Sequence, residues 1–171
     1  MTKILMTGGG APGAPGIIKC LTSSKNDYDL VVGDANNISS GRFLNKNFKK
    51  LPHSSSEKFI EKILNYSIKN HIDIIFPLVT KELFKFSNNK QLFKNKGIDI
   101  IVSDLKGLEI ANNKSMLYQF LDNNKINVPK FRIIDNIKYL PKLVKELGYP
   151  KSRIVIKPSS SNGSRGVRIL D

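Results

Sequence analysis

The stretch from Ile156 to Gly166 carries the residues best suited to bind a phosphate group. Lys157 and Arg165 bring positive charge to a polar loop. The other polar or small members of this loop are Ser159, Ser160, Ser161, Asn162, Gly163, Ser164 and Gly166. Hydroxyl groups, backbone N–H groups and glycines allow a loop to fold closely over an anion. The loop therefore indicates a nucleotide phosphate site, with a solvated hairpin tip as the alternative, because Ser-rich turns are common.

Strands are predicted on both sides of this loop. Arg153 to Lys157 contains a run of β-branched residues, and Val167 to Leu170 resumes an apolar pattern. The order is strand, polar loop and returning strand. Because the sequence stops at Asp171, directly after the second strand, we expect the chain to be the N-terminal fragment of a longer protein.

A second candidate for ligand binding lies near the N-terminus, where Gly8, Gly10 and Gly13 form the spacing G-x-G-x-x-G. An apolar run from Lys3 to Thr7 precedes these glycines, and a helical pattern follows them. The next predicted strand ends at Asp34, 21 residues beyond Gly13. This is the start of a nucleotide-type βαβ unit. A dinucleotide is one candidate ligand, although two prolines in the turn are unusual for a loop that wraps a pyrophosphate.

Strands and helices continue to alternate up to residue 102, so a mostly parallel, doubly wound, Rossmann-like α/β sheet is expected. Its predicted strands number four, and Asn36 to Ser56 is expected to be a long loop with at most one helical turn. Thr80 is expected to cap a short helix that has Glu82 in its first turn. The later elements are a helix at Glu57–Lys69, a strand at Asp73–Phe76, a helix at Thr80–Phe86 and a strand at Gly97–Val102.

The pattern changes after residue 104, which predicts a domain over residues 1–104 and a second, incomplete α+β unit over residues 105–171. Met116, Leu117, Phe120 and Leu121 are expected to face inward from one helix of this second unit. Its expected elements are helices at Leu105–Ala111, Lys114–Asn124 and Ile137–Leu147, a strand at Phe131–Ile134, and the two strands that flank the polar loop.

Composition narrows the classes of function. The chain has 171 residues, of which 40% are hydrophobic, and no apolar run approaches the roughly 18 residues that cross a bilayer. The net charge of +14 comes mainly from scattered lysines rather than clustered arginines with aromatics, which argues against nucleic acid. No secretory signal follows Met1, so a cytoplasmic location is expected. Cys20 is expected to be a small buried hydrophobe, and His53 and His71 lack neighbours at metal-ligand spacing.

Four motifs together resemble the ATP-grasp superfamily, and within it the carbamoyl-phosphate synthase large subunit and related carboxylate-amine ligases. ILMTGGGAPG, the strand ending at Asp34 and FPLVTKEL resemble the Rossmann-like domain that precedes the ATP-grasp domain of such ligases. NNKSMLYQFLDNNKINVP resembles their segment in which a lysine opens a helix, with Asn113 here in place of the usual Asp. RIVIKPSSSNGSRGV resembles their strand with an ATP-contacting lysine, followed by a flexible phosphate-covering loop.

The resemblance implies two sets of site residues. Lys114 and Lys157 would contact ATP, and the phosphate-covering loop would comprise Ser159, Ser160, Ser161, Asn162, Gly163, Ser164 and Gly166. The substrate-facing set would be Gly8, Gly9, Gly10, Asp34, Thr80 and Glu82. The Mg²⁺ ligands of the family would lie in a later part of the protein, so no metal site is expected in this chain.

The function that the resemblance implies is ATP-dependent ligation of a small carboxylate to an amine or ammonia through an acylphosphate, with ATP and Mg²⁺ as cofactors. No nucleic-acid or membrane partner is expected, and a homodimer is compatible with this function. The chain alone is expected to bind ATP weakly and to be inactive. A nicotinamide-dependent oxidoreductase or epimerase, built on the glycine turn and Asp34, is the alternative, and a non-catalytic nucleotide-sensing or nucleic-acid-binding module is a third.

Overall fold

The computed structural model describes residues 1–26, 28–161 and 163–171. The chain forms two compact units, residues 1–105 and residues 106–171, which we call the N-terminal and C-terminal units. No helix among the described residues is both long and apolar enough to cross a membrane.

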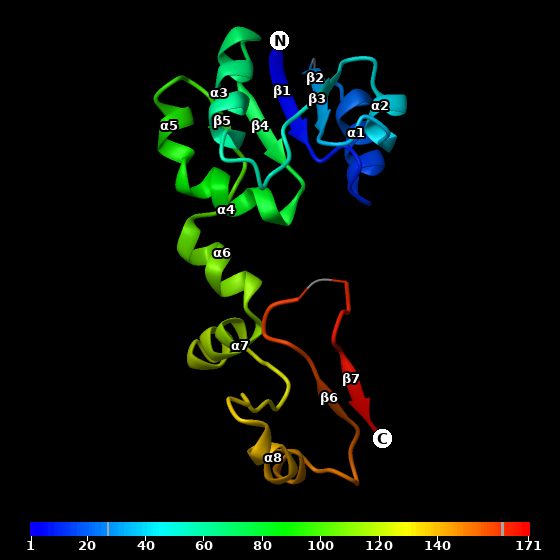
Figure 1. Cartoon of the computed structure of the whole chain (residues 1–171), viewed down its shortest axis with the longest axis vertical. Helices are drawn as coiled ribbons and strands as arrows, with labels where there is room; N and C mark the ends of the chain where they lie inside the picture. Colours follow the sequence, from blue (N-terminus) through cyan, green and yellow to red (C-terminus); the bar gives the residue numbers. More distant parts are fainter. Residues whose placement is uncertain (27, 162) are drawn as a thin grey trace. The chain divides into compact units, whose positions relative to one another are not determined.

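A five-stranded parallel sheet forms the centre of the N-terminal unit (Figure 1), in the order β3-β2-β1-β4-β5. The strands are β1 (Thr2–Thr7), β2 (Tyr28–Asp34), β3 (Phe48–Lys50), β4 (Ile74–Pro77) and β5 (Asp99–Ile100). The predicted doubly wound α/β fold is confirmed. The order reverses between β1 and β4, and in open α/β sheets such a reversal opens a crevice at the carboxyl ends of the strands.

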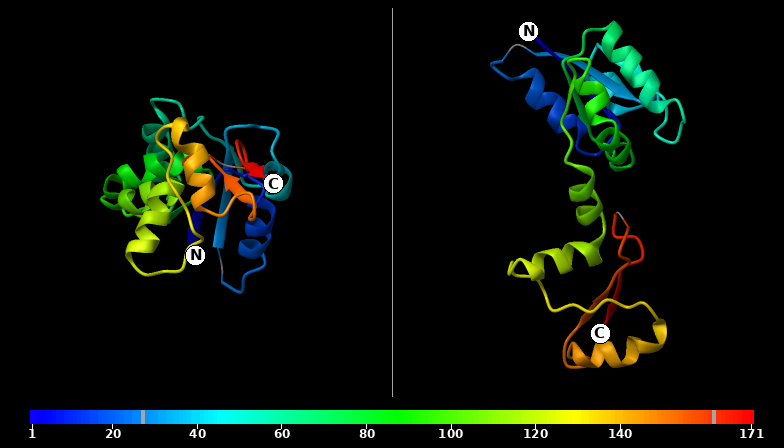
Figure 2. Two further views of the ribbon diagram at one scale, coloured as in Figure 1. Left: turned by 90° about the horizontal axis from the view of Figure 1, so that it is seen from below. Right: turned by 90° about the vertical axis from the view of Figure 1, so that its left-hand side faces the viewer.

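Helices cover both faces of this sheet. They are α1 (Ala14–Thr22), α2 (Ser40–Leu44), α3 (Phe59–Lys69), α4 (Thr80–Asn88) and α5 (Lys90–Lys94). Ile4 and Met6 of β1 pack with α1, whereas Leu5 belongs to the core cluster that contains residues of α3, α4 and α5. This alternation follows from the period of two in a strand. The right-hand view of Figure 2 shows α1 and α3 on opposite faces of the sheet.

Aromatic rings fill the larger of the two cores. Phe86 is fully buried, and its ring packs edge to face on Phe59 and Phe93, with centroid distances of 5.4 and 6.0 Å. Such edge-to-face pairs add to the stabilisation from burial. The N-terminal unit therefore closes its own hydrophobic core on both sides of the sheet.

Three expectations for the N-terminal unit were wrong. The expected loop at 36–56 contains α2 and the edge strand β3, so the sheet has five strands and not four. Thr80 is the first residue of α4 and not its cap, because the extended residue before the helix is Val79. Cys20 is exposed, because the buried positions of α1 are Ala14 and Ile18 and position 20 falls on another face of the helix.

The C-terminal unit has less regular structure. Its helices are α6 (Leu105–Asn112), which starts at the boundary, α7 (Lys114–Asn123), the 3-10 helix η1 (Ile137–Tyr139) and α8 (Leu140–Glu146). Strands β6 (Ile154–Ile156) and β7 (Arg168–Leu170) form an antiparallel pair, as expected for strands that flank a loop. In the described part of this unit, Val144 and Ile154 are the buried hydrophobic residues.

Two expectations for the C-terminal unit were also wrong. Phe131–Ile134 has extended residues but does not pair with another strand among the described residues. Met116 and Phe120 of α7 are 42% and 46% exposed, so the expected inward face of this helix is only partly covered.

Candidate functional site

A glycine turn joins β1 to α1 and packs tightly against its surroundings. Gly8 has φ +74°, and a Cβ there would lie 2.6 Å from Val79 Cγ2. A Cβ on Gly41 would lie 2.9 Å from the Cα of Gly9. The Gly41 N–H donates to Gly9 O, which holds the start of α2 against the turn. Glycine is therefore required at these positions for close backbone approach.

Asp34, at the end of β2, is hydrogen-bonded to the glycine turn. Its Oδ2 accepts from the Gly10 N–H and its Oδ1 accepts from the Asn36 N–H, both at 2.7 Å. The Ala11 N–H donates to Gly8 O. The Asp34 carboxylate thus already accepts from the Gly10 N–H, which a bound phosphate would need as a donor.

Several further donors of the turn are also engaged or absent. The Gly9 N–H donates to Gly33 O, and the Ala14 N–H donates to Ala11 O. Pro12 and Pro15 have no N–H. The turn is therefore poorly equipped to wrap a pyrophosphate, and this geometry disfavours a dinucleotide at the site.

Glu82 reaches this end of the sheet from the first turn of α4. Its side chain is 7% exposed, and its Oε2 accepts a hydrogen bond of 2.5 Å from Thr7 Oγ1. The pKa of Glu82 is raised to about 7, mainly by burial and in part by the negative charge of Asp34, while the Thr7 hydrogen bond lowers it. A carboxyl that titrates near neutral pH at a ligand-binding edge is a functional candidate.

The register of the sheet explains why these groups lie together. Thr7 pairs with Gly33 of β2 on one side and with Pro77 of β4 on the other. The loops that follow β1, β2 and β4 therefore begin at one edge, which is the point where the strand order reverses. Sequence reasoning missed Thr7, because a threonine at the end of an apolar strand gives no local signal. Two of the predicted substrate residues, Thr80 and Glu82, lie on α4. Thr80 is exposed, whereas Glu82 is buried.

Lys114 is the first residue of α7 in the C-terminal unit, and it donates hydrogen bonds to the polar loop. Its N–H donates to Ser159 O at 2.8 Å, and its Nζ donates to Ser161 O at 2.9 Å. The hydroxyls of Ser115 and Ser159 share a hydrogen bond of 2.6 Å. Asn113 accepts from the N–H groups of Ser115 and Met116, so the helix starts where the sequence predicts.

Lys157, directly after β6, points to the same helix. Its Nζ donates to Tyr118 Oη at 2.6 Å and lies 4.8 Å from the centre of the Tyr118 ring. The short distance to the oxygen makes the hydrogen bond the main contact. Tyr118 in turn packs edge to face on Phe131. Sequence reasoning did not single out Tyr118 and Ser115, although both lie in the segment NNKSMLYQFLDNNKINVP, because their roles depend on contacts with residues about 40 positions later.

The loop between β6 and β7 is open at its tip and closed at its base. A Cβ on Gly166 would lie 2.7 Å from Pro158 Cγ, whereas Gly163 has open space around it. Ser164 has φ +57° and accepts from the Val167 N–H. Ser160 is exposed. Asn162, predicted to belong to this loop, lies outside the described residues.

Lys114 and Lys157 of the C-terminal site do not form an ion pair with a described acid. Ion pairs elsewhere in the chain include Lys3–Asp29, Lys94–Asp99, Arg132–Glu146 and Arg153–Asp171. Two cations beside hydroxyls and glycines match the donor set that binds phosphate.

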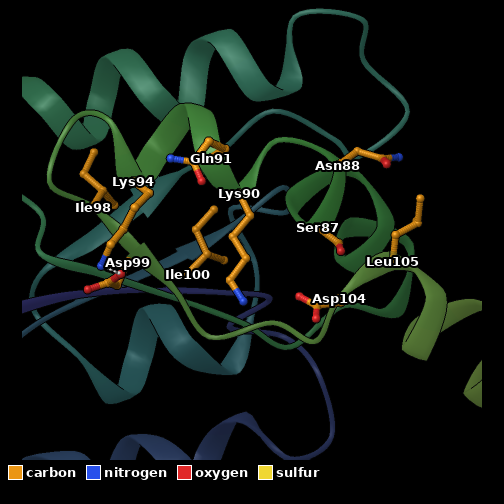
Figure 3. Close-up of a pocket in the computed structure, with 10 residues that line it drawn as sticks. All are labelled: Ser87, Asn88, Lys90, Gln91, Lys94, Ile98, Asp99, Ile100, Asp104 and Leu105. Atoms are coloured by element: carbon orange, nitrogen blue, oxygen red, sulfur yellow. Dashed lines mark hydrogen bonds and ion pairs between the residues drawn. The ribbon is translucent and has the colours of Figure 1, made fainter.

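A pocket of about 480 Å³ lies elsewhere in the N-terminal unit, between α4, α5 and β5 (Figure 3). Its lining contains none of the predicted site residues. Lys90 Nζ donates to Val102 O, and Lys94 pairs with Asp99, so its cations already have partners. We assign it no ligand. Among the described residues, no group of three or more His, Cys, Asp and Glu side chains could hold a metal ion.

Solved structures with a similar fold include biotin carboxylases and a pyruvate carboxylase. A biotin carboxylase from Campylobacter jejuni, in complex with beta-gamma-ATP, has a TM-score of 0.69 and 19% identity over 99% of this chain and 38% of its own. The biotin carboxylase domain of Hydrogenobacter thermophilus 2-oxoglutarate carboxylase, a dimer with MgADP, ADP and bicarbonate, has a TM-score of 0.64 and 20% identity over 98% of this chain and 37% of its own. Rhizobium etli pyruvate carboxylase has a TM-score of 0.63 and 16% identity over 99% of this chain and 15% of its own.

The chain thus shares its fold with these carboxylases over 98–99% of its length, which agrees with the resemblance. Residues 4–101 match the family model of the PylC-like N-terminal domain, which is more than half of the chain. The chain therefore belongs to the PylC-like N-terminal domain family. No curated protein matches it significantly. The chain spans less than two fifths of the length of these structural relatives.

Proposed function

We propose that the chain forms the N-terminal part of an ATP-dependent ligase that joins a small carboxylate to an amine or ammonia. In this reaction the carboxylate takes the γ-phosphoryl group of ATP, which gives an acylphosphate and ADP, and the amine then displaces phosphate. The observation that carries the proposal is the convergence of Lys114 and Lys157 at the base of the Ser/Gly loop, with neither lysine in an ion pair with a described acid.

These groups suit phosphoryl transfer, in which a protein acts mainly by positioning and by stabilising charge. Lys114 and Lys157 would neutralise charge on the ATP phosphates. The hydroxyls of Ser159 and Ser161, together with loop N–H groups, would orient the phosphoryl oxygens. A loop that closes over the phosphates would also keep water from the acylphosphate.

The structural relatives support the choice of cofactor and substrate class. They were solved with MgADP, ADP, bicarbonate and beta-gamma-ATP, and one of them is a dimer. We infer ATP, a small carboxylate and a cytoplasmic location for the parent, and the motifs favour chemistry similar to that of carbamoyl-phosphate synthase. We place the Mg²⁺ ligands in a further part of the parent protein, and among the described residues there is no group of three or more His, Cys, Asp and Glu side chains that could hold a metal ion.

ADP release by the parent protein, meaning this chain extended to the length of its relatives, tests the proposal. With a panel of carboxylates and amines we expect ATP to be converted to ADP only when both substrates are present. Lys157→Met should lower kcat/KM on the order of a hundredfold, because a donor to the transferring group is lost. Lys151→Met, which removes an exposed lysine outside the loop, is the matched control. Release of AMP, or turnover without nucleotide, would contradict the ligase.

The chain of 171 residues is itself expected to bind Mg-ATP weakly and to lack activity. Its C-terminal unit supplies one wall of a nucleotide cleft and no described metal ligands, whereas tight sites bury most of their ligand. Calorimetric titration with Mg-ATP measures this. A low-micromolar dissociation constant, or ATP hydrolysis by the purified chain, would show that the site is more complete. Titration with NADH tests the oxidoreductase: saturable binding lost in Asp34→Ala would favour it.

A further inference from the structure

The side chain of Tyr118 fixes the position of the Lys157 ammonium group. Its hydroxyl accepts a hydrogen bond of 2.6 Å from Lys157 Nζ, which also lies 4.8 Å from the centre of the Tyr118 ring. Lys157 itself is exposed and forms no ion pair with a described acid. An exposed lysine has a long flexible stem and samples many rotamers. The contact with Tyr118 is therefore what places its charge.

Tyr118 also determines which part of the site receives this charge. Tyr118 and Lys114 lie four residues apart in α7, and residues at this spacing share one face of a helix. Lys114 Nζ donates to Ser161 O, in the loop between β6 and β7, and Figure 1 shows α7 beside this loop. The contact with Tyr118 thus brings the second lysine to the helix face that carries the first.

The ring of Tyr118 is itself held by packing. Phe131 packs on it edge to face, with a centroid distance of 5.3 Å and an interplanar angle of 63°. The next residue, Arg132, is tied to α8, because its Nε lies 3.1 Å from Glu146 Oε2. A side chain that is locked by packing can hold a functional group in place. The segment that contains Phe131 therefore supports Tyr118, although it does not pair as a strand.

The contact leaves Lys157 able to bind phosphate. An ammonium group has three N–H donors, and the Tyr118 hydroxyl takes one of them, so two remain for phosphate oxygens. A hydroxyl group carries no charge, whereas a carboxylate partner would neutralise the lysine. Tyr118 is therefore better suited than an acid to hold a cation that must attract an anionic ligand.

We propose that Tyr118 is a positioning residue of the nucleotide site, which holds the Lys157 ammonium group on the Lys114 face of α7 before ATP binds. The proposal rests on the ligase function proposed above, and it adds a residue that acts on ATP through Lys157. The advantage is entropic, since a lysine that is already ordered loses little rotamer freedom when its ligand arrives.

The first experiment measures the order of the Lys157 side chain in the chain of 171 residues, without nucleotide, by NMR relaxation of labelled lysines. Tyr118→Phe removes the hydroxyl and keeps the ring that packs on Phe131. We expect Lys157 to be ordered in the wild-type chain and as mobile as the exposed Lys151 in this variant. Tyr139→Phe, on an exposed tyrosine of η1, is the matched control and should leave the order of Lys157 unchanged.

The second experiment measures the consequence for nucleotide binding, by calorimetric titration of the parent protein with Mg-ATP in the absence of carboxylate and amine. Tyr118→Phe should raise the dissociation constant about three- to tenfold, as expected when one long side chain must be ordered on binding. Tyr139→Phe should leave this constant unchanged.

Two results would overturn the proposal. One is equal order of Lys157 in the wild-type chain and in Tyr118→Phe. The other is an unchanged or lower dissociation constant for Mg-ATP in Tyr118→Phe, and a lower one would mean that Tyr118 restrains Lys157 against the nucleotide. Because neither measurement requires turnover, these results would not overturn the ligase function, which ADP release by the parent protein tests separately.

Discussion

The two units differ both in how they are held together and in the charge of their candidate sites. Buried hydrophobic residues lie on both faces of the N-terminal sheet, whereas Val144 and Ile154 are the buried ones in the described part of the C-terminal unit. The N-terminal edge presents carboxylates, and the C-terminal loop presents lysines. The N-terminal unit closes a hydrophobic core on both faces of its sheet, whereas the C-terminal hairpin is held largely by polar contacts to α7.

Removing an aromatic ring from the N-terminal core should have the largest effect. Phe86→Ala leaves a cavity between Phe59 and Phe93 and should cost about 3–5 kcal/mol of unfolding free energy. Val144→Ala, in the C-terminal unit, should cost about 1–2 kcal/mol. Urea unfolding with hydrogen exchange measures both changes. If Val144→Ala were as costly as Phe86→Ala, the contrast in packing between the units would be wrong.

The pH dependence of stability tests the acidic edge. The pKa of Glu82 is about 7 in the folded protein, above its ordinary 4.5, so the folded state retains a proton that the unfolded state releases. Stability should therefore fall as pH rises from about 4.5 to about 7 and then level off, by up to about 3 kcal/mol. Glu82→Gln should flatten this dependence, measured by urea unfolding at several pH values, and Glu57→Gln should not. A dependence that survives in Glu82→Gln would assign it to another group.

The order of elements in the N-terminal unit could be predicted because its signals are local. The glycine turn, the apolar runs and the helical spacing from Phe59 onward each lie within one stretch of sequence. The edge strand β3 could not be predicted, because only half-buried Phe48 and two exposed lysines form it and its backbone pairing with β2 defines it. The opposite error occurred at Phe131–Ile134, where a strand was predicted and none formed. An apolar pattern does not make a strand when no partner strand pairs with it.

The candidate sites could be predicted in part. Two lysines, Lys114 and Lys157, and the Ser/Gly loop can be recognised from their residue types within motifs. In the structure Lys114, on α7, donates to the loop, and Lys157, next to the loop, donates to Tyr118 of α7. Thr7 and Tyr118 could not be predicted. Each is placed by pairing or packing with residues far away in the sequence, as Thr7 is with Glu82, 75 positions later. Their contribution depends on tertiary structure, which local patterns do not encode.

Loss of the close contact between Gly41 and Gly9 should have an intermediate effect on the free energy of unfolding. Gly41→Ala would place a methyl group 2.6 Å from Val32 Cγ1 and 2.9 Å from Gly9 Cα, and the backbone cannot move away easily. We expect a loss of about 1–3 kcal/mol in unfolding free energy. Gly16→Ala is the control, because it lies in α1 with nothing within 4 Å and should be neutral or stabilising. Thermal unfolding of both variants decides whether the close contact, rather than any glycine loss, matters.

The smallest effect is expected at the start of α7, where the C-terminal unit depends on one polar side chain. Asn113→Ala removes the acceptor for the N–H groups of Ser115 and Met116 and should cost about 1 kcal/mol. Asn113→Asp should retain the cap, because a carboxylate accepts the same bonds and favours a helix N-terminus. Hydrogen exchange at Ser115 and Met116 measures the fraying directly. Because Lys114 follows the cap and donates to Ser159 O and Ser161 O, the alanine variant should also loosen the polar loop. Unchanged exchange in Asn113→Ala would mean that packing, not the cap, holds Lys114 in place.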